Sequence, residues 1–349
     1  MLTELDHLPP GLLDTAAEDL HQILPGPTLI HLGGRREPPL FVSVLLHGNE
    51  DTGLIAVQRL LNRLRGHELP RALSLFIGNV AAARYRVRRL EGQPDYNRTW
   101  PGTESPESEE TRLMRQVFEL MAQRRPFASI DLHNNTGFNP HYSAVNRTAD
   151  QFLQLASLFG RTVVYFRRPK GVQTAAFAEL CPSVTVECGK PGQDHGVEHA
   201  LEYLEACLNL ASIPDHPVAA HDIDLFHTVA QVHIRDEISF GIGETAADLA
   251  LDRDLDRLNF RELPAGTELG VVREGGGMPV VAYDEPGQEV TRSYFAVDHR
   301  RLVLTRPMMP SMLTLDERVL RQDCLCYLME RLPPPQRQGD GSSSNTSLV

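Results

Sequence analysis

The stretch FVSVLLHGNEDTG, residues 41–53, joins an expected buried strand to an expected helix. Its first half is a continuous apolar run rich in Val and Phe, which is typical of a strand buried on both faces. Over residues 52–64, apolar residues recur at helical spacing. His47 and Glu50 therefore lie on the turn beyond the strand, where ligands collect in open α/β sheets. This imidazole and carboxylate could bind a metal ion, or they could form a polar turn with a glutamate that starts the helix.

Composition limits the class of protein. The 349 residues, 41% of them hydrophobic, suit one large or two moderate globular domains. No apolar stretch approaches the roughly 18 residues of a membrane span, and we expect no secretory signal at the N-terminus. Five cysteines without C-x-x-C spacing are typical of reduced thiols in a cytoplasm. The net charge of −12 argues against nucleic acid or an anionic membrane as partner, so we expect a cytoplasmic protein with neither partner.

Strand-like and helical patterns alternate from residue 40 to about 212. Strands are expected at 40–47, 72–80, 127–133, 162–166 and 183–188, and helices at 52–64, 109–124, 149–160 and 197–211. This alternation predicts an α/β fold whose sheet is covered by helices on both faces. Beyond it, short β-like runs predict a β-rich C-terminal domain over 223–332, which ends in a helix at 315–332. The tail, 333–349, is rich in Pro, Gly and Ser, and we expect it to be disordered.

A second expected strand also ends in polar side chains. FASIDLHNNTG, residues 127–137, is apolar until Asp131 and His133 follow. If the two strands are neighbours, their ends bring His47, Glu50 and His133 within a few ångströms. Two imidazoles and one carboxylate, with a fourth position open to water, are the ligand set of catalytic zinc. Asp131 lies on the same side of its strand as His133, where it could orient an imidazole.

Hydrolysis at such a site also needs a general base and a positive group near the developing oxyanion. Glu187, at the end of the apolar strand in SVTVECGKPG (183–192), is the candidate base, although alone it would be taken for a helix-cap or salt-bridge glutamate. The loop ARYRVRRLEGQPDYNRTWPG (83–102) contains four arginines before Asn97 and Arg98. An arginine fork suits a substrate carboxylate, and a neighbouring Asn can share its oxygen. Several of these arginines could instead be solvated.

Four motifs occur in an order that resembles one known family. LLHGNEDTG (45–53), GNVAAARYRVRRLEGQPDYNRTWPG (78–102), IDLHNNTG (130–137) and TVECGK (185–190) resemble the succinylglutamate desuccinylase/aspartoacylase family, a branch of the zinc carboxypeptidase-like hydrolases. The resemblance covers roughly residues 40–200 and extends more loosely into the β-rich part. It implies a zinc-carboxypeptidase-like mixed sheet covered by helices on both faces, in a catalytic domain at 1–222.

The resemblance also implies roles for particular residues. One zinc ion per chain would be held by His47, Glu50 and His133. Glu187 would act as general base and then as proton donor to the leaving amine, and Asn97 and Arg98 would bind a substrate carboxylate. An upstream arginine would polarise the scissile carbonyl. The loop is slightly longer than the family pattern, so Arg88 or Arg89 could take this role, and we choose Arg88.

One departure from the family bears on the substrate. Family enzymes that cleave acyl groups with their own carboxylate place an arginine shortly before the catalytic glutamate. The corresponding stretch here, GVQTAAFAELCPSVTVE (171–187), contains none, and we expect Phe177 to form an apolar wall. Arg167, Arg168 or Lys170 could replace the missing arginine, but a basic surface loop is the expectation.

Two other candidates are expected to be structural. His195 and His199 are four residues apart on an expected helix, a spacing that can bind a metal, but without a nearby third ligand we expect a polar helix face. Cys188 could be a nucleophile with a histidine partner. Because it alternates to the other side of the strand from Glu187, we expect a small buried residue instead.

We therefore expect a zinc-dependent amide hydrolase whose partner is a small-molecule amide, either an N-acyl amino acid or a similar amide with a free carboxylate. One alternative is a metallocarboxypeptidase that removes C-terminal residues from short peptides. Another is a binding protein that keeps the metal site without turnover. A β-rich domain that caps the cleft would exclude long peptides, and the presence of Glu187 argues against a protein without turnover. The sequence leaves the oligomeric state open.

Overall fold

Strand β3 (Leu40–Val44) and helix α1 (Thr52–Arg63) form where the sequence predicts them, in a computed structural model that describes residues 1–243 and 246–333. All five residues of β3 are buried. Val42 packs in the cluster that contains the apolar stripe of α1, whereas Phe41 points into a second cluster on the other face. A strand covered on both faces needs no polar alternation, which explains the continuous apolar run.

The sheet around β3 is mixed, and three neighbouring parallel strands lie near its centre. Along the sheet the order is β1 (Thr3–Leu5), β2 (Thr28–Leu32), β4 (Leu73–Ile77), β3, β5 (Ala128–His133), β8 (Ser183–Glu187), β6 (Tyr142–Val145), β7 (Thr162–Tyr165) and β9 (Asp224–Ile234). The pairs β3–β5 and β5–β8 are parallel, whereas β2–β4 and β6–β8 are antiparallel. The carboxyl ends of β3, β5 and β8 therefore lie side by side at one edge of the sheet.

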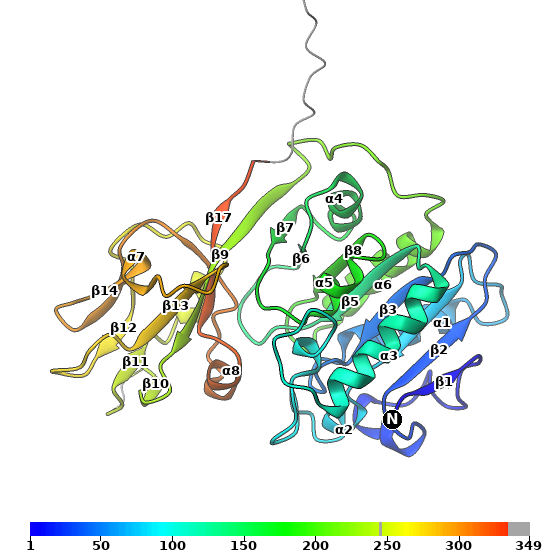
Figure 1. Ribbon diagram of the computed structural model, residues 1–349, viewed down its shortest axis with the longest axis horizontal. Coiled ribbons are helices and arrows are strands. Elements are labelled where there is room, and N and C mark those ends of the chain that lie inside the picture. The colour runs from blue at the N-terminus through cyan, green and yellow to red at the C-terminus, as the bar shows by residue number, and fades with distance from the viewer. Residues whose placement is uncertain (244–245, 334–349) are drawn as a thin grey trace, which may run out of the picture.

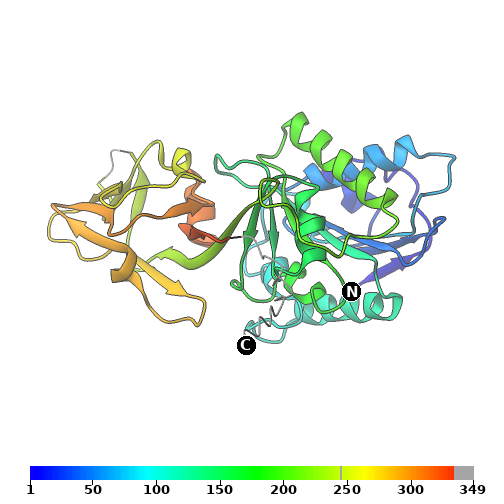
Figure 2. The same cartoon turned by 90° about the horizontal axis from the view of Figure 1, so that it is seen from above.

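Helices cover both faces of this sheet (Figure 1, Figure 2). One face carries α1, α4 (Asp150–Ser157) and α6 (Asp194–Asn209), whose buried residues share one cluster. The other carries α3 (Glu109–Arg124) and α5 (Gln173–Phe177). Shorter elements are α2 (Val80–Ala83) and the 3₁₀ helices η1 (Ala17–Gln22) and η2 (Tyr96–Arg98). The expected α/β sheet covered on both faces is confirmed.

The C-terminal part is β-rich and has its own core (Figure 1). Its separate sheet has the order β10 (Phe240–Ile242), β11 (Leu249–Leu251), β12 (Glu268–Val272), β15 (Arg301–Leu304) and β14 (Phe295–Asp298). The long strand β9 links the C-terminal part to the large sheet. One end of β9 pairs with β7, and the other end pairs with β13 (Val280–Asp284) of the C-terminal part. The short elements are η3 (Leu255–Leu258), α7 (Thr291–Tyr294) and β16 (Met309–Ser311). The expected boundary after residue 222 falls directly before β9.

The helix expected over residues 315–332 is wrong in its second half. Only α8 (Glu317–Gln322) is helical, and the chain then forms β17 (Cys326–Arg331), which pairs with β9. The apolar residues here suit either helical or strand spacing, and the free edge of β9 selects the strand. The tail expected to be disordered lies, apart from residue 333, outside the described residues.

Within the described residues, no helix is long and apolar enough to cross a membrane. All five cysteines lie among the described residues. They are buried, and none forms a disulfide with another.

Candidate active site

The turn that carries His47 and Glu50 is held against α2. Gly48 packs so closely on α2 that a Cβ would lie 2.2 Å from the backbone nitrogen of Ala83, so glycine is required. The Gly48 amide also donates to the carbonyl of Arg88 at 3.2 Å. The turn is thus fixed to the loop that carries the arginines, and both His47 and Glu50 are buried.

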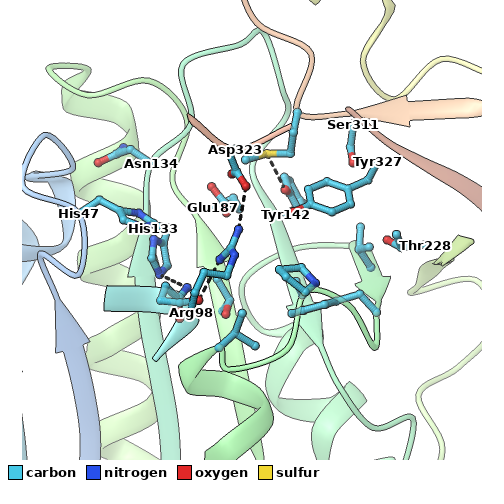
Figure 3. Close-up of a pocket in the computed structure, with 18 of the residues that line it drawn as sticks. His47, Arg98, His133, Asn134, Tyr142, Glu187, Thr228, Ser311, Asp323 and Tyr327 are labelled. Atoms are coloured by element: carbon cyan, nitrogen blue, oxygen red, sulfur yellow. Dashed lines mark hydrogen bonds and ion pairs between the residues drawn. The ribbon is translucent and has the colours of Figure 1, made fainter. Parts of the chain in front are cut away.

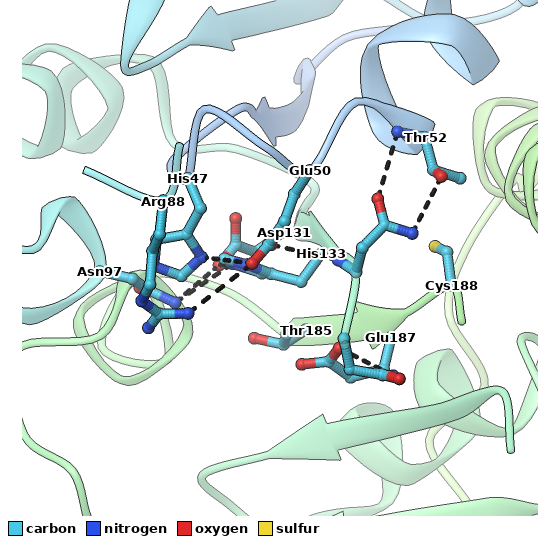
Figure 4. A network of polar contacts seen from close by, with 12 residues as sticks. His47, Glu50, Thr52, Arg88, Asn97, Asp131, His133, Thr185, Glu187 and Cys188 are labelled. Atoms are coloured by element: carbon cyan, nitrogen blue, oxygen red, sulfur yellow. Dashed lines mark hydrogen bonds and ion pairs between the residues drawn. The ribbon is translucent and has the colours of Figure 1, made fainter. Parts of the chain in front are cut away.

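Three buried side chains converge at this edge of the sheet (Figure 4). His47 Nδ1 lies 2.9 Å from Glu50 Oε1, and His133 Nδ1 lies 2.8 Å from Glu50 Oε2. One ligand atom from each of the three residues lies within 4.8 Å of the other two. They meet because β3 and β5 are paired in parallel. Two imidazole nitrogens and a carboxylate at this spacing fit one divalent metal ion of the zinc type.

Each imidazole places its second nitrogen on a carboxylate. His47 Nε2 lies 3.0 Å from Asp95 Oδ1, and His133 Nε2 lies 2.7 Å from Asp131 Oδ2. If these carboxylates accept the Nε2 protons, the Nδ1 lone pairs of both rings face Glu50. Carboxylates orient metal-binding histidines in this way.

Electrostatics favour a charged Glu50. Burial by itself raises the pKa of this carboxyl, but the adjacent His47 and His133 rings hold the pKa far below its ordinary value. Burial lowers the pKa of His133, yet the carboxylates of Asp131 and Glu50 raise it well above its ordinary value. The surroundings therefore keep Glu50 in the carboxylate form that binds a cation.

Glu187 ends β8 directly beside His133, its partner in the parallel register of β5 and β8. Burial raises the pKa of Glu187 to about 7, which the charge of His133 opposes and that of Glu50 supports. Its Oε2 lies 3.5 Å from Asn135 Nδ2. A carboxyl with a pKa near neutrality can both accept and release a proton, which suits a general base.

Arg88, and not Arg89, lies beside the three-residue cluster. Arg88 is largely buried and donates to Asp95 Oδ2 from Nε at 3.1 Å and from Nη2 at 2.9 Å. Its Nη1 lies 3.7 Å from Glu50 Oε1. Arg89 instead donates to the carbonyl of Gln93 at 2.8 Å. The sequence left the choice between Arg88 and Arg89 open. In the structure, Arg88 is the one that lines the cavity next to the cluster, which is described below.

Asn97 and Arg98 lie on η2, next to the cluster. Asn97 Nδ2 lies 3.1 Å from His133 Nε2, and its Oδ1 accepts a hydrogen bond from the amide of Gln173 on α5 at 2.9 Å. Arg98 donates from Nη1 to the Asn97 carbonyl at 2.8 Å and from Nη2 to Asp323 Oδ1 at 2.9 Å (Figure 3). The arginine expected to bind a substrate carboxylate is thus already paired with a carboxylate of the C-terminal part.

These residues line a cavity of about 700 Å³, counting the open space at its mouth (Figure 3). One wall is largely apolar and comes from the large sheet and its loops: Tyr142, Ala144, Val164, Phe166, Pro169 and Val172. Another wall comes from β9 and the C-terminal part: Thr228, Ser311, Met312, Asp323 and Tyr327. The C-terminal part therefore narrows the space beside the cluster.

The expectation for Phe177 is wrong, because this residue does not line the cavity. Its ring is fully buried and stacks on Phe41 with 4.3 Å between ring centroids, and Trp100 packs edge-on at 5.7 Å. The helical turn of α5 directs the ring into the core beneath the sheet. Arg168, expected on a basic surface loop, does line the cavity, although its Nη atoms lie 3.3 and 3.4 Å from the Glu104 carboxylate.

The sequence reasoning missed Asp95, Asp323, Tyr142 and Tyr327. Asp95 had a signal, because it lies two residues before Asn97 in the quoted loop. Asp323 and Tyr327 had none, since they fall in the segment expected to be helical. Tyr142 lies on β6, a strand that the sequence pattern did not suggest, and is the register partner of Glu187.

Cys188 and the two histidines of α6 lie outside the cavity. Cys188 is fully buried, and burial raises the pKa of its thiol well above the ordinary value, so it stays protonated. His199 lies with its Nδ1 2.8 Å from Nδ1 of His141, and the His195 ring stacks on His141 at 5.3 Å. A third histidine, His141, therefore lies beside the pair that the sequence pointed to.

Solved structures share this fold at low sequence identity. Succinylglutamate desuccinylase from Chromobacterium violaceum is 17% identical, with 87% of each chain covered and a TM-score of 0.54. Succinylglutamate desuccinylase from Vibrio parahaemolyticus is 12% identical, with 87% of this chain and 86% of that chain covered and a TM-score of 0.58. Murine aminoacylase 3 is 15% identical, with 85% and 97% covered and a TM-score of 0.52. Among curated proteins, none matches the chain.

The sequence also matches a family model. The model of the succinylglutamate desuccinylase/aspartoacylase catalytic domain matches residues 37–211, half of the 349 residues. This range contains both strand-end histidines, the arginine loop and Glu187. The chain therefore belongs to the succinylglutamate desuccinylase/aspartoacylase family, a branch of the zinc carboxypeptidase-like hydrolases.

Proposed function

We propose that the protein is a zinc-dependent hydrolase that cleaves the amide bond of an N-acyl amino acid or a similar small amide with a free carboxylate. Membership of the family indicates an amide hydrolase of the desuccinylase/aspartoacylase type. The observation that carries the finer proposal is the buried cluster of His47, Glu50 and His133 with Glu187 beside it.

The cluster would hold one zinc ion through His47 Nδ1, His133 Nδ1 and a Glu50 oxygen. Zinc bound there would supply Lewis acidity, which polarises a carbonyl and makes a water molecule more acidic. Asp95 and Asp131 lie 3.0 and 2.7 Å from the Nε2 atoms of the two rings, where they would accept the Nε2 protons and fix the orientation of the rings. The donor set matches catalytic zinc, which keeps one position free of protein ligands.

Glu187 is the proposed general base and acid. It would accept a proton from the attacking water and then donate it to the departing nitrogen. A pKa raised to about 7 by burial suits both steps at neutral pH. Arg88 would stabilise negative charge on the carbonyl oxygen, since its Nη1 lies close to the cluster, 3.7 Å from Glu50.

Asn97 and Arg98 are proposed to bind the substrate carboxylate, because both line the cavity. The wall that the C-terminal part contributes favours a small amide over a peptide, and we prefer the deacylase to the carboxypeptidase alternative on this ground. The residues of a peptide that precede the released one would have to pass this wall.

Hydrolysis assays on the zinc-loaded protein test the proposal. Wild type is expected to cleave N-acyl amino acids faster than peptides of increasing length. Glu187→Gln is expected to keep its zinc and to lower kcat by about 10²–10⁴-fold, the usual contribution of a general base. A Glu187→Gln protein with full activity would contradict the assigned role, and activity that increases with peptide length would support the carboxypeptidase instead.

A further inference from the structure

Asp323 brings a negative charge from the C-terminal part into the cavity. It lies at the end of α8 and its side chain is 13% exposed. Oδ1 accepts a hydrogen bond from Arg98 at 2.9 Å (Figure 3). Oδ2 accepts one from Arg88 at 3.3 Å. The two arginines hold the pKa of Asp323 below its ordinary value despite its burial. Asp323 is therefore a charged carboxylate within the cavity.

The charges of this part of the cavity are balanced before any substrate enters. Arg88 is paired with Asp95, and Arg98 is paired with Asp323. A substrate carboxylate that binds Arg98 would therefore lie next to the carboxylate of Asp323. Two neighbouring negative charges repel each other, most strongly where water is excluded. A substrate with one carboxylate and no positive group is poorly matched to this pair.

The Arg98–Asp323 pair nevertheless has free hydrogen-bonding capacity. The side-chain contacts of Arg98 described above use two of the five N–H donors of a guanidinium. Those of Asp323 use two of about four acceptor positions of a carboxylate. Both residues line the cavity. The pair can therefore bind a carboxylate on Arg98 and an ammonium group on Asp323 at the same time.

The remaining walls suggest where the acyl group lies. Val164, Phe166 and Val172 are apolar, and the nearby cation, Arg168, already has the Glu104 carboxylate as partner. A neutral acyl group such as acetyl suits this wall better than an acyl group with its own carboxylate. The charged groups of the substrate therefore belong to the amine portion.

We propose that the substrate is an N-acyl diamino acid, whose free carboxylate binds Arg98 and whose free ammonium group binds Asp323. Asp323 is then the residue that determines specificity, and it does so from the C-terminal part of the chain. This inference rests on the proposed function, because it names the substrate class of the same site.

Two isosteric substrates test the inference on the zinc-loaded full chain. Nα-acetyl-L-ornithine carries an ammonium group where Nα-acetyl-L-norleucine carries a methyl group. We expect kcat/KM to be at least about tenfold higher for the ornithine compound, the ratio that one favourable charge contact of about 1.4 kcal/mol produces. Comparison of kcat/KM for Nα-acetyl-L-ornithine and Nδ-acetyl-L-ornithine shows which of the two nitrogens carries the acyl group in the preferred substrate. Equal or faster cleavage of the norleucine compound would overturn the inference.

Asp323→Asn tests the residue, since it removes the charge and keeps the shape. The ornithine preference is expected to fall below about threefold, and kcat/KM for N-acetyl-L-glutamate is expected to rise, because its carboxylates no longer meet Asp323. If Asp323 had a purely structural role, the substitution would lower kcat/KM for the ornithine, norleucine and glutamate compounds together. Asp316→Asn is the matched control: it makes the same change at the exposed N-cap of α8, where Asn caps equally well, and should keep the preference.

Calorimetry separates this inference from the proposed function. If none of the amides is cleaved, the hydrolase proposal fails, and the substrate class is then decided by titration of the zinc-loaded protein with the intact Nα-acetyl-L-ornithine and Nα-acetyl-L-norleucine, of which only the first carries an ammonium group. Binding of Nα-acetyl-L-ornithine at least about tenfold tighter supports the inference. Equal binding overturns it, and this comparison needs only the wild-type protein.

Discussion

Glu187 and His133 are direct partners in the parallel register of β8 and β5. This relationship places the candidate base beside a candidate metal ligand. Because β3 is the next strand on the other side of β5, the turn with His47 and Glu50 reaches the same point. Three consecutive parallel strand ends therefore build the site, and the edge of the sheet determines its geometry.

Metal content is the first prediction. Purified wild-type protein supplied with zinc is expected to hold about one ion per chain, and His133→Ala close to none, because two remaining ligands bind zinc weakly. Mass spectrometry after removal of excess metal measures both. His195→Ala is the control, since it removes an exposed histidine outside the cavity. Zinc retained by His133→Ala would reject the assigned ligand set.

Asp131 is predicted to be a positioning residue. Asp131→Asn replaces the carboxylate that lies 2.7 Å from His133 Nε2 with a neutral amide. We expect the affinity for zinc to fall by about 10–100-fold. Competition with a chromophoric chelator measures the dissociation constant. The metal-free variant should unfold at a temperature close to that of the metal-free wild type. Unchanged affinity would contradict the positioning role of Asp131.

The stability of the metal-free protein should depend on pH through Glu187. Burial raises the pKa of Glu187 from 4.5 to about 7, so below pH 4.5 the carboxyl is protonated in both the folded and the unfolded chain. Between pH 4.5 and 7 the unfolded chain releases this proton first, and the contribution of Glu187 to folding stability is progressively lost.

Glu187→Gln removes this loss. At pH 8 the metal-free variant is expected to exceed the metal-free wild type in free energy of unfolding by up to about 3 kcal/mol, and at pH 4 the difference should nearly vanish. Urea denaturation at both pH values measures it. A difference that is independent of pH would mean that Glu187 titrates normally.

Phe177 is predicted to stabilise the fold without contacting substrate. Phe177→Ala leaves a void beside Phe41 and Trp100, and we expect a loss of about 3–5 kcal/mol in the free energy of unfolding. Phe138→Ala, at a residue that is 66% exposed, should change it by less than about 0.5 kcal/mol. Equal effects of the two substitutions would contradict the buried position of the Phe177 ring.

Local patterns were enough to predict which strand ends meet at the candidate site. The apolar runs before His47, His133 and Glu187 predicted strands, and polar residues at their ends predicted a shared edge of the sheet. This worked because a strand buried on both faces must be continuously apolar, so a polar residue marks where it leaves the core. Asp131 followed from the alternation of side chains along its own strand.

Residues that meet the site through long-range packing could not be predicted in this way. Arg98 and Asp323 are 225 positions apart, and nothing in either segment predicts that they pair. Phe177 was expected in the cavity and lies in the core, because the direction of a side chain on a short helix depends on what the helix packs against. Residues 326–331 were expected to be helical and became β17, because the open edge of β9 was available to pair with them.

The sequence by itself determined the α/β class, the β-rich C-terminal part and the side chains of a candidate metal site. Only the tertiary structure decided that Arg88, and not Arg89, lies beside the cluster, and that Asp323 shares the cavity with Arg98. The physical reason is that periodicity reports which side of an element faces the core. The order and register of the strands, which come from packing of the whole chain, decide which side chains meet.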